Sequence, residues 1–450
     1  MAFPKYESYK DSGEDWLGEV PEHWEVKSLS SILINRNEKN EPVKTKDILS
    51  LSIASGVTPY SDENRGGNKA KNDLTAYKLA YPGDIVLNSM NVVVGAVGLS
   101  KYFGAISPVY YALYLRNKEK TSIDFYSYIF SNSTFQKYLF QYGKGILVKK
   151  SDSGKLNTIR MKISMQDLKK VPLPLPPITE QKRIVEFLDH KTSEIDEAIA
   201  KKQRLIKLLQ EQKAILINQA VTKGLNPKAT MRDSGVEWVG EIPEHWEVAR
   251  LKTLMKKMDQ GWSPQCFNYP ADDNQWGVLK VGCVNGYQFN STENKVLPPN
   301  LKPISELEIK HKDILISRAN TIELVGSAAC ILEPRKKLLI SDKLFRVLAD
   351  EEKVMPEFLV LLLQVRTARM QIEIGANGAS FSMQNIGRDV IRNIWSAIPP
   401  VCEQKEILNL VLAINDQSRR MTAAILKEIE VMTEFKYTLI ANIVTGKILI

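Results

Sequence analysis

Two long amphipathic patterns mark this chain. From Glu180 to about Thr222, apolar residues recur at gaps of three, four and seven, with charged residues between them. The same pattern returns from Glu403 to about Ile443. Such a stripe is typical of a long helix that packs on another helix. We therefore predict two helices of about 40 residues each. Because a whole domain separates the two patterns, they leave both parallel and antiparallel pairing open.

A proline pair precedes each predicted helix, at Pro176-Pro177 and at Pro399-Pro400. Proline fixes its own φ and disfavours helix at the residue before it, so each pair predicts a rigid turn into the helix. The following letters, "ITEQKRI" and "VCEQKEI", are closely similar. The two helices therefore belong to a repeated unit.

The regions before the helices have a different pattern. Short β-branched and aromatic runs such as "GDIVLNSM" from Gly83 and "KDILISRA" from Lys312 alternate with Gly, Pro and Asn. They predict strands in a compact mixed sheet. One amphipathic helix is expected late in each region, in "IDFYSYIFSNSTFQKYLF" from Ile123 and "PEFLVLLLQVRTARMQI" from Pro356. Each repeat is thus an α+β domain followed by a long helix.

A further repeat opens each half. "DSGEDWLGEVPEHWEV" begins at Asp11, and "DSGVEWVGEIPEHWEV" begins 222 residues later at Asp233. The helices repeat at an offset of 223, whereas the regions between drift to offsets of 229–234. The opening segment therefore belongs with the helices, in a shared frame. We expect its tryptophans to pack each domain against that frame, at the seam, meaning the interface between domain and helix. They are Trp16, Trp24, Trp238 and Trp246.

Composition narrows the class of protein. The formal net charge of +9 and the pI of about 9.0 favour a polyanionic partner. The four cysteines lack the short paired spacing of a zinc site or a disulfide framework, and we expect buried thiols. The N-terminus has no secretory pattern, and no apolar stretch approaches the length of a membrane span. We therefore expect a cytoplasmic protein without a membrane segment.

Motifs for catalysis are not found. Gly446-Lys447 lacks the upstream glycine of a phosphate-binding loop. The proline pairs lead into helices and do not form the base-holding loop of an adenine methyltransferase. His23 and His245 repeat within "PEHWEV" without a nearby nucleophile, which favours packing or hydrogen bonding. The Glu-x-Lys at residues 308–310 resembles a nuclease motif, but it arises often by chance in charged loops. Recognition is the function that remains.

Polar loops after equivalent strands are the candidate DNA contacts. "NSMNVVVG" from Asn88 and "SRANTIELVG" from Ser317 supply Asn and Arg, which pair with the edges of adenine and guanine. "YGKGILVKKSDSGK" from Tyr142 offers glycines and lysines to phosphates, and "GANGASFSMQN" from Gly375 is its polar counterpart. For each of these stretches the alternative interpretation is a solvent-exposed hairpin that does not contact DNA. The candidate DNA-binding residues are Ser89, Asn91, Lys144, Lys149, Lys150, Arg318, Asn320, Asn377 and Ser380.

The doubled "PEHWEV", the "GDI" and "KDI" strands and the two "PP…EQK" helix starts together resemble the DNA-specificity subunits of type I restriction-modification systems. The resemblance covers essentially the whole chain. It implies an α+β fold with two globular target recognition domains, separated by two long helices packed as an antiparallel coiled coil with pseudo-two-fold internal symmetry. The segments expected are 1–170 for recognition domain 1, 171–225 for the first long helix, 226–395 for recognition domain 2 and 396–450 for the second long helix.

The resemblance also implies a function. Each domain would read one half of a bipartite DNA target, while the paired helices set the spacer and dock two modification (methyltransferase) subunits, which restriction/translocase subunits join. The chain itself would be non-catalytic and hold no cofactor or metal, with S-adenosylmethionine, ATP and Mg²⁺ in the partner subunits. A coiled-coil adaptor and a self-contained DNA methyltransferase or nuclease are the alternatives.

Overall fold

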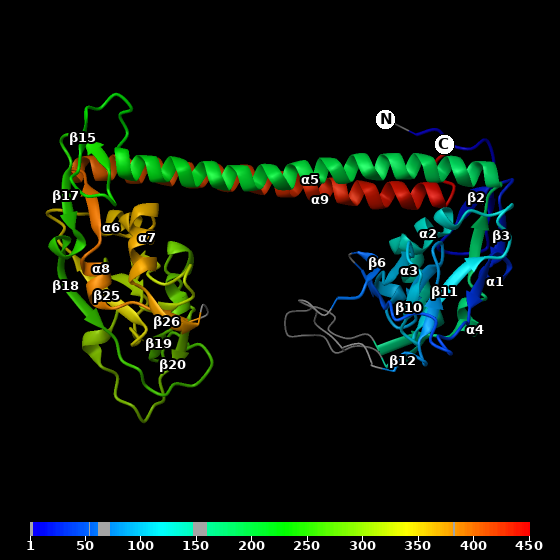
Figure 1. Ribbon diagram of the computed structural model, residues 1–450, viewed down its shortest axis with the longest axis horizontal. Coiled ribbons are helices and arrows are strands. Elements are labelled where there is room, and N and C mark those ends of the chain that lie inside the picture. The colour runs from blue at the N-terminus through cyan, green and yellow to red at the C-terminus, as the bar shows by residue number, and fades with distance from the viewer. Residues whose placement is uncertain (1–2, 54, 62–72, 147–159, 381–382) are drawn as a thin grey trace. The chain divides into compact units, whose positions relative to one another are not determined.

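The computed structural model describes the chain except residues 1–2, 54, 62–72, 147–159 and 381–382 (Figure 1). It divides into two compact units. Unit 1 comprises residues 1–203 and 426–450, and unit 2 comprises residues 204–425. Each long helix contributes part of its length to each unit, and the four consecutive segments expected from the sequence stay a prediction.

The two long helices are continuous and end close to where the sequence predicts. Helix α5 spans Ile178–Lys223, and α9 spans Val401–Val444. In unit 1 they run antiparallel: Asp196 of α5 forms an ion pair with Lys436 of α9, and Lys202, farther along α5, pairs with Glu428, earlier in α9.

In unit 2 the end of α5 packs against the start of α9. Ala220 and Val221 share a buried core with Ile407 and Val411. The stripe of apolar positions thus faces the partner helix and the adjoining domain, as its period requires. The pairing direction that the sequence pattern left open is therefore antiparallel within each unit.

Unit 1 is built on a four-stranded antiparallel sheet in the order β4-β11-β8-β9. These strands are β4 (Leu33–Arg36), β11 (Tyr110–Leu115), β8 (Ile85–Asn88) and β9 (Val97–Leu99). Antiparallel pairs of strands accompany it in the described part of the unit. They are β1 (Tyr9–Asp11) with β2 (Glu19–Pro21), β3 (Glu25–Ser28) with β14 (Pro172–Leu175), β5 (Leu49–Ser52) with β6 (Gly56–Pro59), β7 (Lys78–Ala80) with β10 (Gly104–Ile106), and β12 (Gly143–Ile146) with β13 (Arg160–Ile163).

Unit 2 repeats this plan with the sheet β18-β25-β21-β23. Its strands are β18 (Met255–Gln260), β25 (Leu344–Ala349), β21 (Ile314–Ser317) and β23 (Ala328–Cys330). Smaller sheets have the orders β20-β19-β24, β22-β27-β26, β15-β16 and β17-β28. Their strands are β19 (Gly277–Leu279), β20 (Asn294–Val296), β24 (Leu338–Leu339), β22 (Ala319–Asn320), β26 (Asn377–Ser380), β27 (Met383–Asn385), β15 (Met231–Asp233), β16 (Glu241–Pro243), β17 (Glu247–Arg250) and β28 (Trp395–Ile398).

The compact mixed sheet expected in each domain needs correction. Both four-stranded sheets are antiparallel, and among the described strands only β19 and β24 pair in parallel. After β8 the chain forms the 3₁₀ turn η1 (Val92–Val94), and β9 begins at Val97. Gly95 follows the turn with φ of 93°, a conformation that favours glycine and redirects the chain into β9.

The amphipathic helix expected in each domain is broken in two. In unit 1, α2 (Ile123–Ser131) ends where Asn132 becomes extended, and the Asn132 side chain caps α3 (Ser133–Tyr138) by accepting from the N–H groups of Thr134 and Phe135. In unit 2, α6 (Pro356–Leu362) is followed by α7 (Arg366–Gly375). Periodicity continues across each break, which is why it predicted one helix. The remaining short helices are α1 (Leu29–Ile32), α4 (Met165–Leu168), α8 (Arg388–Arg392), η2 (Leu139–Tyr142), η3 (Leu251–Leu254), η4 (Val281–Tyr287) and η5 (Ser305–Leu307).

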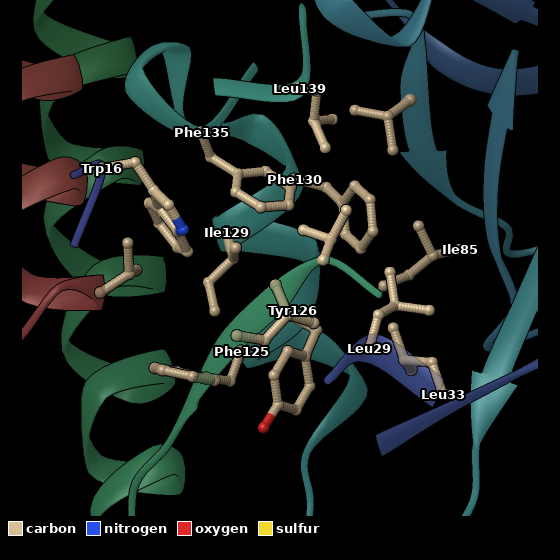
Figure 2. Close-up of a cluster of buried hydrophobic side chains, with 14 of the residues drawn as sticks. Trp16, Leu29, Leu33, Ile85, Phe125, Tyr126, Ile129, Phe130, Phe135 and Leu139 are labelled. Atoms are coloured by element: carbon tan, nitrogen blue, oxygen red, sulfur yellow. The ribbon is translucent and has the colours of Figure 1, made fainter. Parts of the chain in front are cut away.

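Aromatic side chains from α2 and α3 fill the core of unit 1 (Figure 2). Phe130 and Phe135 meet edge to face, with ring centroids 5.3 Å apart, and Trp16 lies 4.7 Å from Phe135. Ile85 of β8 and Leu33 of β4 bring the sheet into the same cluster. The core therefore joins the sheet to both short helices and holds the loops after β8 on a rigid base.

Cysteine burial differs from the expectation at one position. Cys283 is buried and Cys266 and Cys330 are partly buried, but Cys402 lies exposed at the start of α9. In the described residues, no helix is both long enough and apolar enough to cross a membrane.

Candidate nucleic-acid interface

In unit 1 the end of strand β8 and the hairpin β12–β13 meet at one place. The N–H of Ile163 on β13 donates to the carbonyl of Ser89, just after β8, at 2.9 Å. The hydroxyl of Tyr111 on β11 donates to the carbonyl of Ile163 at 3.2 Å. The two candidate stretches that begin at Asn88 and Tyr142 therefore form one surface.

Unit 2 uses the same junction. The N–H of Ile386, after β27, donates to the carbonyl of Arg318 at 3.0 Å. Strand β27 pairs with β22 on one side and β26 on the other, so Asn385 lies opposite both Ala319 and Asn377. The stretches around Arg318 and Asn377 are thereby brought together. Spacing alone could not predict this pairing.

The polar residues after β8 have different exposures. Ser89 is 1% exposed, and its hydroxyl donates to the carbonyl of Val109 at 2.8 Å. It therefore holds the strand end in place, and a direct contact of Ser89 with DNA stays a prediction. Asn91 is exposed two residues later. The side chain of Asn88, which the sequence did not single out, accepts from the N–H of Met90 at 3.0 Å and shapes this turn.

The corresponding residues of unit 2 are partly engaged. Arg318 is partly exposed, and one guanidinium nitrogen donates to the carbonyl of Asp342 at 3.3 Å. Asn320 is also partly exposed and donates to the side-chain oxygen of Asn285 at 3.1 Å. Asn377 is exposed on β26.

Three candidate contacts are only partly described or not described. Lys149 and Lys150 lie outside the described residues. Ser380 ends the backbone of β26, and its side chain lies outside the described part of the chain.

Lysines gather around the hairpin of unit 1. Lys144 on β12 lies directly opposite Lys162 on β13, a like-charge pair that an anion would stabilise. Lys144 also forms a 3.2 Å ion pair with Asp167. The hydrogen bond from Ser164 and the contact with Lys144 hold the pKa of Asp167 below its usual value. Lys162 is exposed, and the described residues give it no ion pair.

A third lysine, Lys78 on β7, lies near this pair. Its ammonium donates to the carbonyl of Tyr110 at 2.9 Å and lies 5.1 Å from the ring centre of Tyr111. Burial and the charge of Lys162 lower the pKa of Lys78. The sequence did not single out Lys78 or Lys162, because residues far apart in the chain meet here only through sheet pairing.

Substitution Lys162→Gln tests whether this cluster contacts phosphates. We expect weaker binding to all duplex sequences alike, with the slope of log Kd against log salt reduced by about 0.9 for one lost phosphate contact. Titrations of the assembled complex at several salt concentrations measure this slope. The matched control is Lys118→Gln, because exposed Lys118 follows Leu115, at the opposite end of β11 from Asn88. An unchanged slope for Lys162→Gln, or an equal loss for Lys118→Gln, contradicts the prediction.

The repeated "PEHWEV" segment is a clasp on the start of each long helix. In unit 1, Nε2 of His23 lies 2.9 Å from Oε2 of Glu180, and Nε1 of Trp24 donates to Oε1 at 3.1 Å. The hydroxyl of Tyr6 also donates to Glu180. Burial and this hydrogen bond raise the pKa of Tyr6, so the hydroxyl stays a donor at neutral pH. In unit 2, His245 and Trp246 contact Glu403 at 2.8 and 3.0 Å.

The glutamine after each glutamate fixes the turn into the helix. Gln181 donates to the carbonyl of Pro176 at 2.7 Å and accepts from the N–H of Ser122, before α2. Gln404 donates to the carbonyl of Pro399 at 2.9 Å and accepts from the N–H of Met355, before α6. The Glu-Gln pair therefore ties the domain's opening segment and its first amphipathic helix to the long helix.

These contacts assign the repeated motif to the frame. The expected hydrogen-bonding role of His23 and His245 is confirmed, and so is the seam position of Trp24 and Trp246. The expectation was wrong for Trp238, which is 38% exposed. Within the described ranges, no group of three or more His, Cys, Asp or Glu side chains is placed to hold a metal ion.

Comparison with known proteins places the chain in a family. Residues 21–208 match the family described as the type I restriction modification DNA specificity domain. A putative type I restriction enzyme specificity subunit, MjaX from Methanocaldococcus jannaschii, is 28% identical over 461 aligned positions, covering 100% of this chain and 98% of that protein. Over its whole length the chain is therefore similar to type I DNA-specificity subunits.

Further similarities extend over parts or all of this chain. The type I restriction enzyme EcoEI specificity subunit of Escherichia coli is 29% identical over 208 residues, which are 46% of this chain and only 35% of that protein. A solved chain of a type I R-M system has a TM-score of 0.62 at 15% identity, covering 94% of this chain and 98% of that one. The HsdS subunit from Thermoanaerobacter tengcongensis has a TM-score of 0.50 at 14% identity, covering 95% and 98%. Both structural likenesses concern the fold alone.

The family match spans the first clasp and the candidate surface of unit 1. It begins at Pro21, in the clasp, and ends within α5. The alternatives of a coiled-coil adaptor and a self-contained methyltransferase or nuclease gain no support from these similarities.

Proposed function

We propose that this chain is a type I DNA-specificity subunit that reads a bipartite DNA sequence, with each unit reading one half-site. The observation that carries the proposal is the same junction in both units. Ile163 is bonded to Ser89 in unit 1 and Ile386 to Arg318 in unit 2, and each bond joins a strand end to a polar hairpin. Two surfaces of the same design but different side chains suit two different half-sites.

The candidate side chains suit two kinds of DNA contact. Asparagine and arginine can form paired hydrogen bonds with base edges in the major groove. Asn91, Arg318, Asn320 and Asn377 are the proposed base contacts. The lysines on β12 and β13 would contact phosphates, which position the protein without specifying sequence.

The paired helices would set the spacer and dock two methyltransferase subunits, which restriction/translocase subunits join. Large apolar side chains on α9 support docking, because Val431 is 52% and Phe435 51% exposed. Methylation and cleavage would belong to these partners, with their S-adenosylmethionine, ATP and Mg²⁺. The chain would be non-catalytic and would supply only the recognition of the DNA sequence.

A footprint of the assembled complex tests this proposal. We expect protection at two separated half-sites, selective for sequence and weakened by salt. A coiled-coil adaptor would assemble with partners without any sequence preference. A self-contained methyltransferase or nuclease would bind S-adenosylmethionine or cut DNA as the purified chain alone. Either of these results contradicts the proposal.

Shortening both helices tests their role in setting the spacer. Removing residues 204–210 of α5 and 421–427 of α9 deletes one heptad from each and leaves Val431 and Phe435 in place, so the apolar stripe stays nearly in phase. Seven residues shorten a helix by about 10 Å. At about 3.4 Å per base pair we expect a spacer shorter by about three base pairs, with unchanged half-sites. Mapping the sites methylated by the assembled complex measures both, and an altered half-site with the original spacer contradicts the prediction.

A further inference from the structure

Unit 2 contains a groove next to its candidate DNA surface. It has a volume of about 840 Å³ and lies between the last turns of α5, the start of α7 and Tyr287 at the end of η4. The N–H of Arg366 donates to the side-chain oxygen of Asn218 on α5 at 3.2 Å, which fixes the two helices to each other. The groove walls are therefore held by defined contacts.

The groove is lined by positive charge. Lys213, Lys223, Arg366 and Arg369 face it, and none of its described lining residues is Asp or Glu. Arg369 is engaged, because it donates to the carbonyl of Val325 and lies 3.7 Å from Glu373. The other three cations form no ion pair within the described chain. Uncompensated cations in a concave site attract anions.

The groove is continuous with the proposed base contacts. Asn285, two residues before Tyr287, accepts from the side chain of Asn320 at 3.1 Å. Arg369 also donates to the carbonyls of Ile322 and Glu323, in the loop that follows Asn320. Tyr287 has φ of 61°, a left-handed conformation that is uncommon for a bulky residue and occurs often at functional sites. An occupant of the groove would therefore lie beside the reading surface.

The equivalent place in unit 1 has a different charge. Lys436 and Ile440 of α9 occupy the repeat positions of Lys213 and Ile217, and they also line a pocket. Asp124 and Asp189 line that pocket as well, and Lys436 is paired with Asp196. Free positive charge at this position is therefore found in unit 2 and not in the described part of unit 1.

We propose that the groove of unit 2 binds the phosphodiester backbone of duplex DNA next to the half-site that unit 2 reads, through Lys213 and Arg366. This inference rests on the proposed function. It adds an asymmetry: the backbone contacts extend beyond the bases read by unit 2, and unit 1 makes no matching contact through its acidic pocket. Duplex DNA is favoured over an acidic protein helix because the groove adjoins Asn320 through Asn285.

The double variant Lys213→Gln/Arg366→Gln tests the proposal in the complex assembled with its methyltransferase subunits. Loss of two phosphate contacts is expected to reduce the slope of log Kd against log salt by about 1.8, with the preferred sequence unchanged. The matched control is Lys405→Gln/Arg420→Gln, which removes two exposed, unpaired charges from α9 in unit 2. Its slope should equal that of the wild type.

Uncharged methylphosphonates locate the contact along the DNA. Placed beside the half-site read by unit 2, they should weaken the wild type and leave the double variant unaffected. Placed beside the other half-site, they should affect both proteins equally. A wild-type salt slope in the double variant overturns the inference, and so does failure of the variant to assemble, which would assign the groove to a protein partner. A wild-type complex without sequence preference would instead contradict the proposed function itself.

Discussion

Replacing residues 30–163 with the corresponding segment of a type I specificity subunit is expected to change one half-site and leave the other half-site and the spacer unchanged. The exchanged segment ends after Ile163, because Arg160–Ile163 form β13 and pair with β12. The exchanged segment then carries the whole junction between Ser89 and Ile163. Methylated positions mapped with the assembled complex measure the outcome.

The frame explains why such an exchange should fold. Strands β3 and β14 pair outside the exchanged segment, and the clasp on Glu180 also stays intact. The reciprocal control replaces the corresponding part of unit 2 and should change only the other half-site. Loss of both specificities in a folded, assembled variant would show that the two units do not read independently.

Substitution Glu180→Ala is expected to destabilise unit 1 by about 3 kcal/mol. The Glu180 side chain is 7% exposed and accepts hydrogen bonds from Tyr6 and Trp24, with His23 at 2.9 Å. Removing it leaves the buried Trp24 Nε1 and the partly buried Tyr6 hydroxyl without an acceptor, at about 1–3 kcal/mol for each unsatisfied buried group, and the costs are not fully additive. Urea denaturation and hydrogen exchange in the first turns of α5 measure the loss.

Two further variants sharpen this test. Glu403→Ala should cost less, about 1–2 kcal/mol, because its side chain is 19% exposed and contacts two partners, His245 and Trp246. Glu186→Ala, at an exposed position on α5, should stay within about 0.5 kcal/mol of the wild type. Equal effects of Glu180→Ala and Glu186→Ala would mean that the clasp does not stabilise the helix start.

The long helices could be predicted from sequence because their signal is local and repeated. An apolar stripe kept over more than ten turns allows few alternatives, and α5 and α9 begin within two residues of the expected Glu180 and Glu403. Proline pairs marked the same boundaries independently. The break at Asn132 was missed, because apolar periodicity continues through it while the Asn side chain caps a new helix.

The candidate surface could be predicted only in part. Loops after equivalent strands were visible as motifs, but their partners depend on pairing across long stretches of chain. Ser89 is held by the hydrogen bond from its hydroxyl to the carbonyl of Val109. Lys162 lies opposite Lys144 because of the register in which β12 and β13 pair. The clasp was recognised as part of the frame from its offset. The hydrogen bond from Trp24 to Glu180 could not be predicted, because the two residues lie far apart in the sequence.

Mapping methylated adenines in DNA exposed to the native assembled complex shows whether the two units read separate half-sites. We expect one bipartite motif, with two defined half-sites and a spacer of fixed length and no preferred sequence. A single continuous motif, or half-sites at variable separation, would contradict reading by two units held on a shared pair of helices.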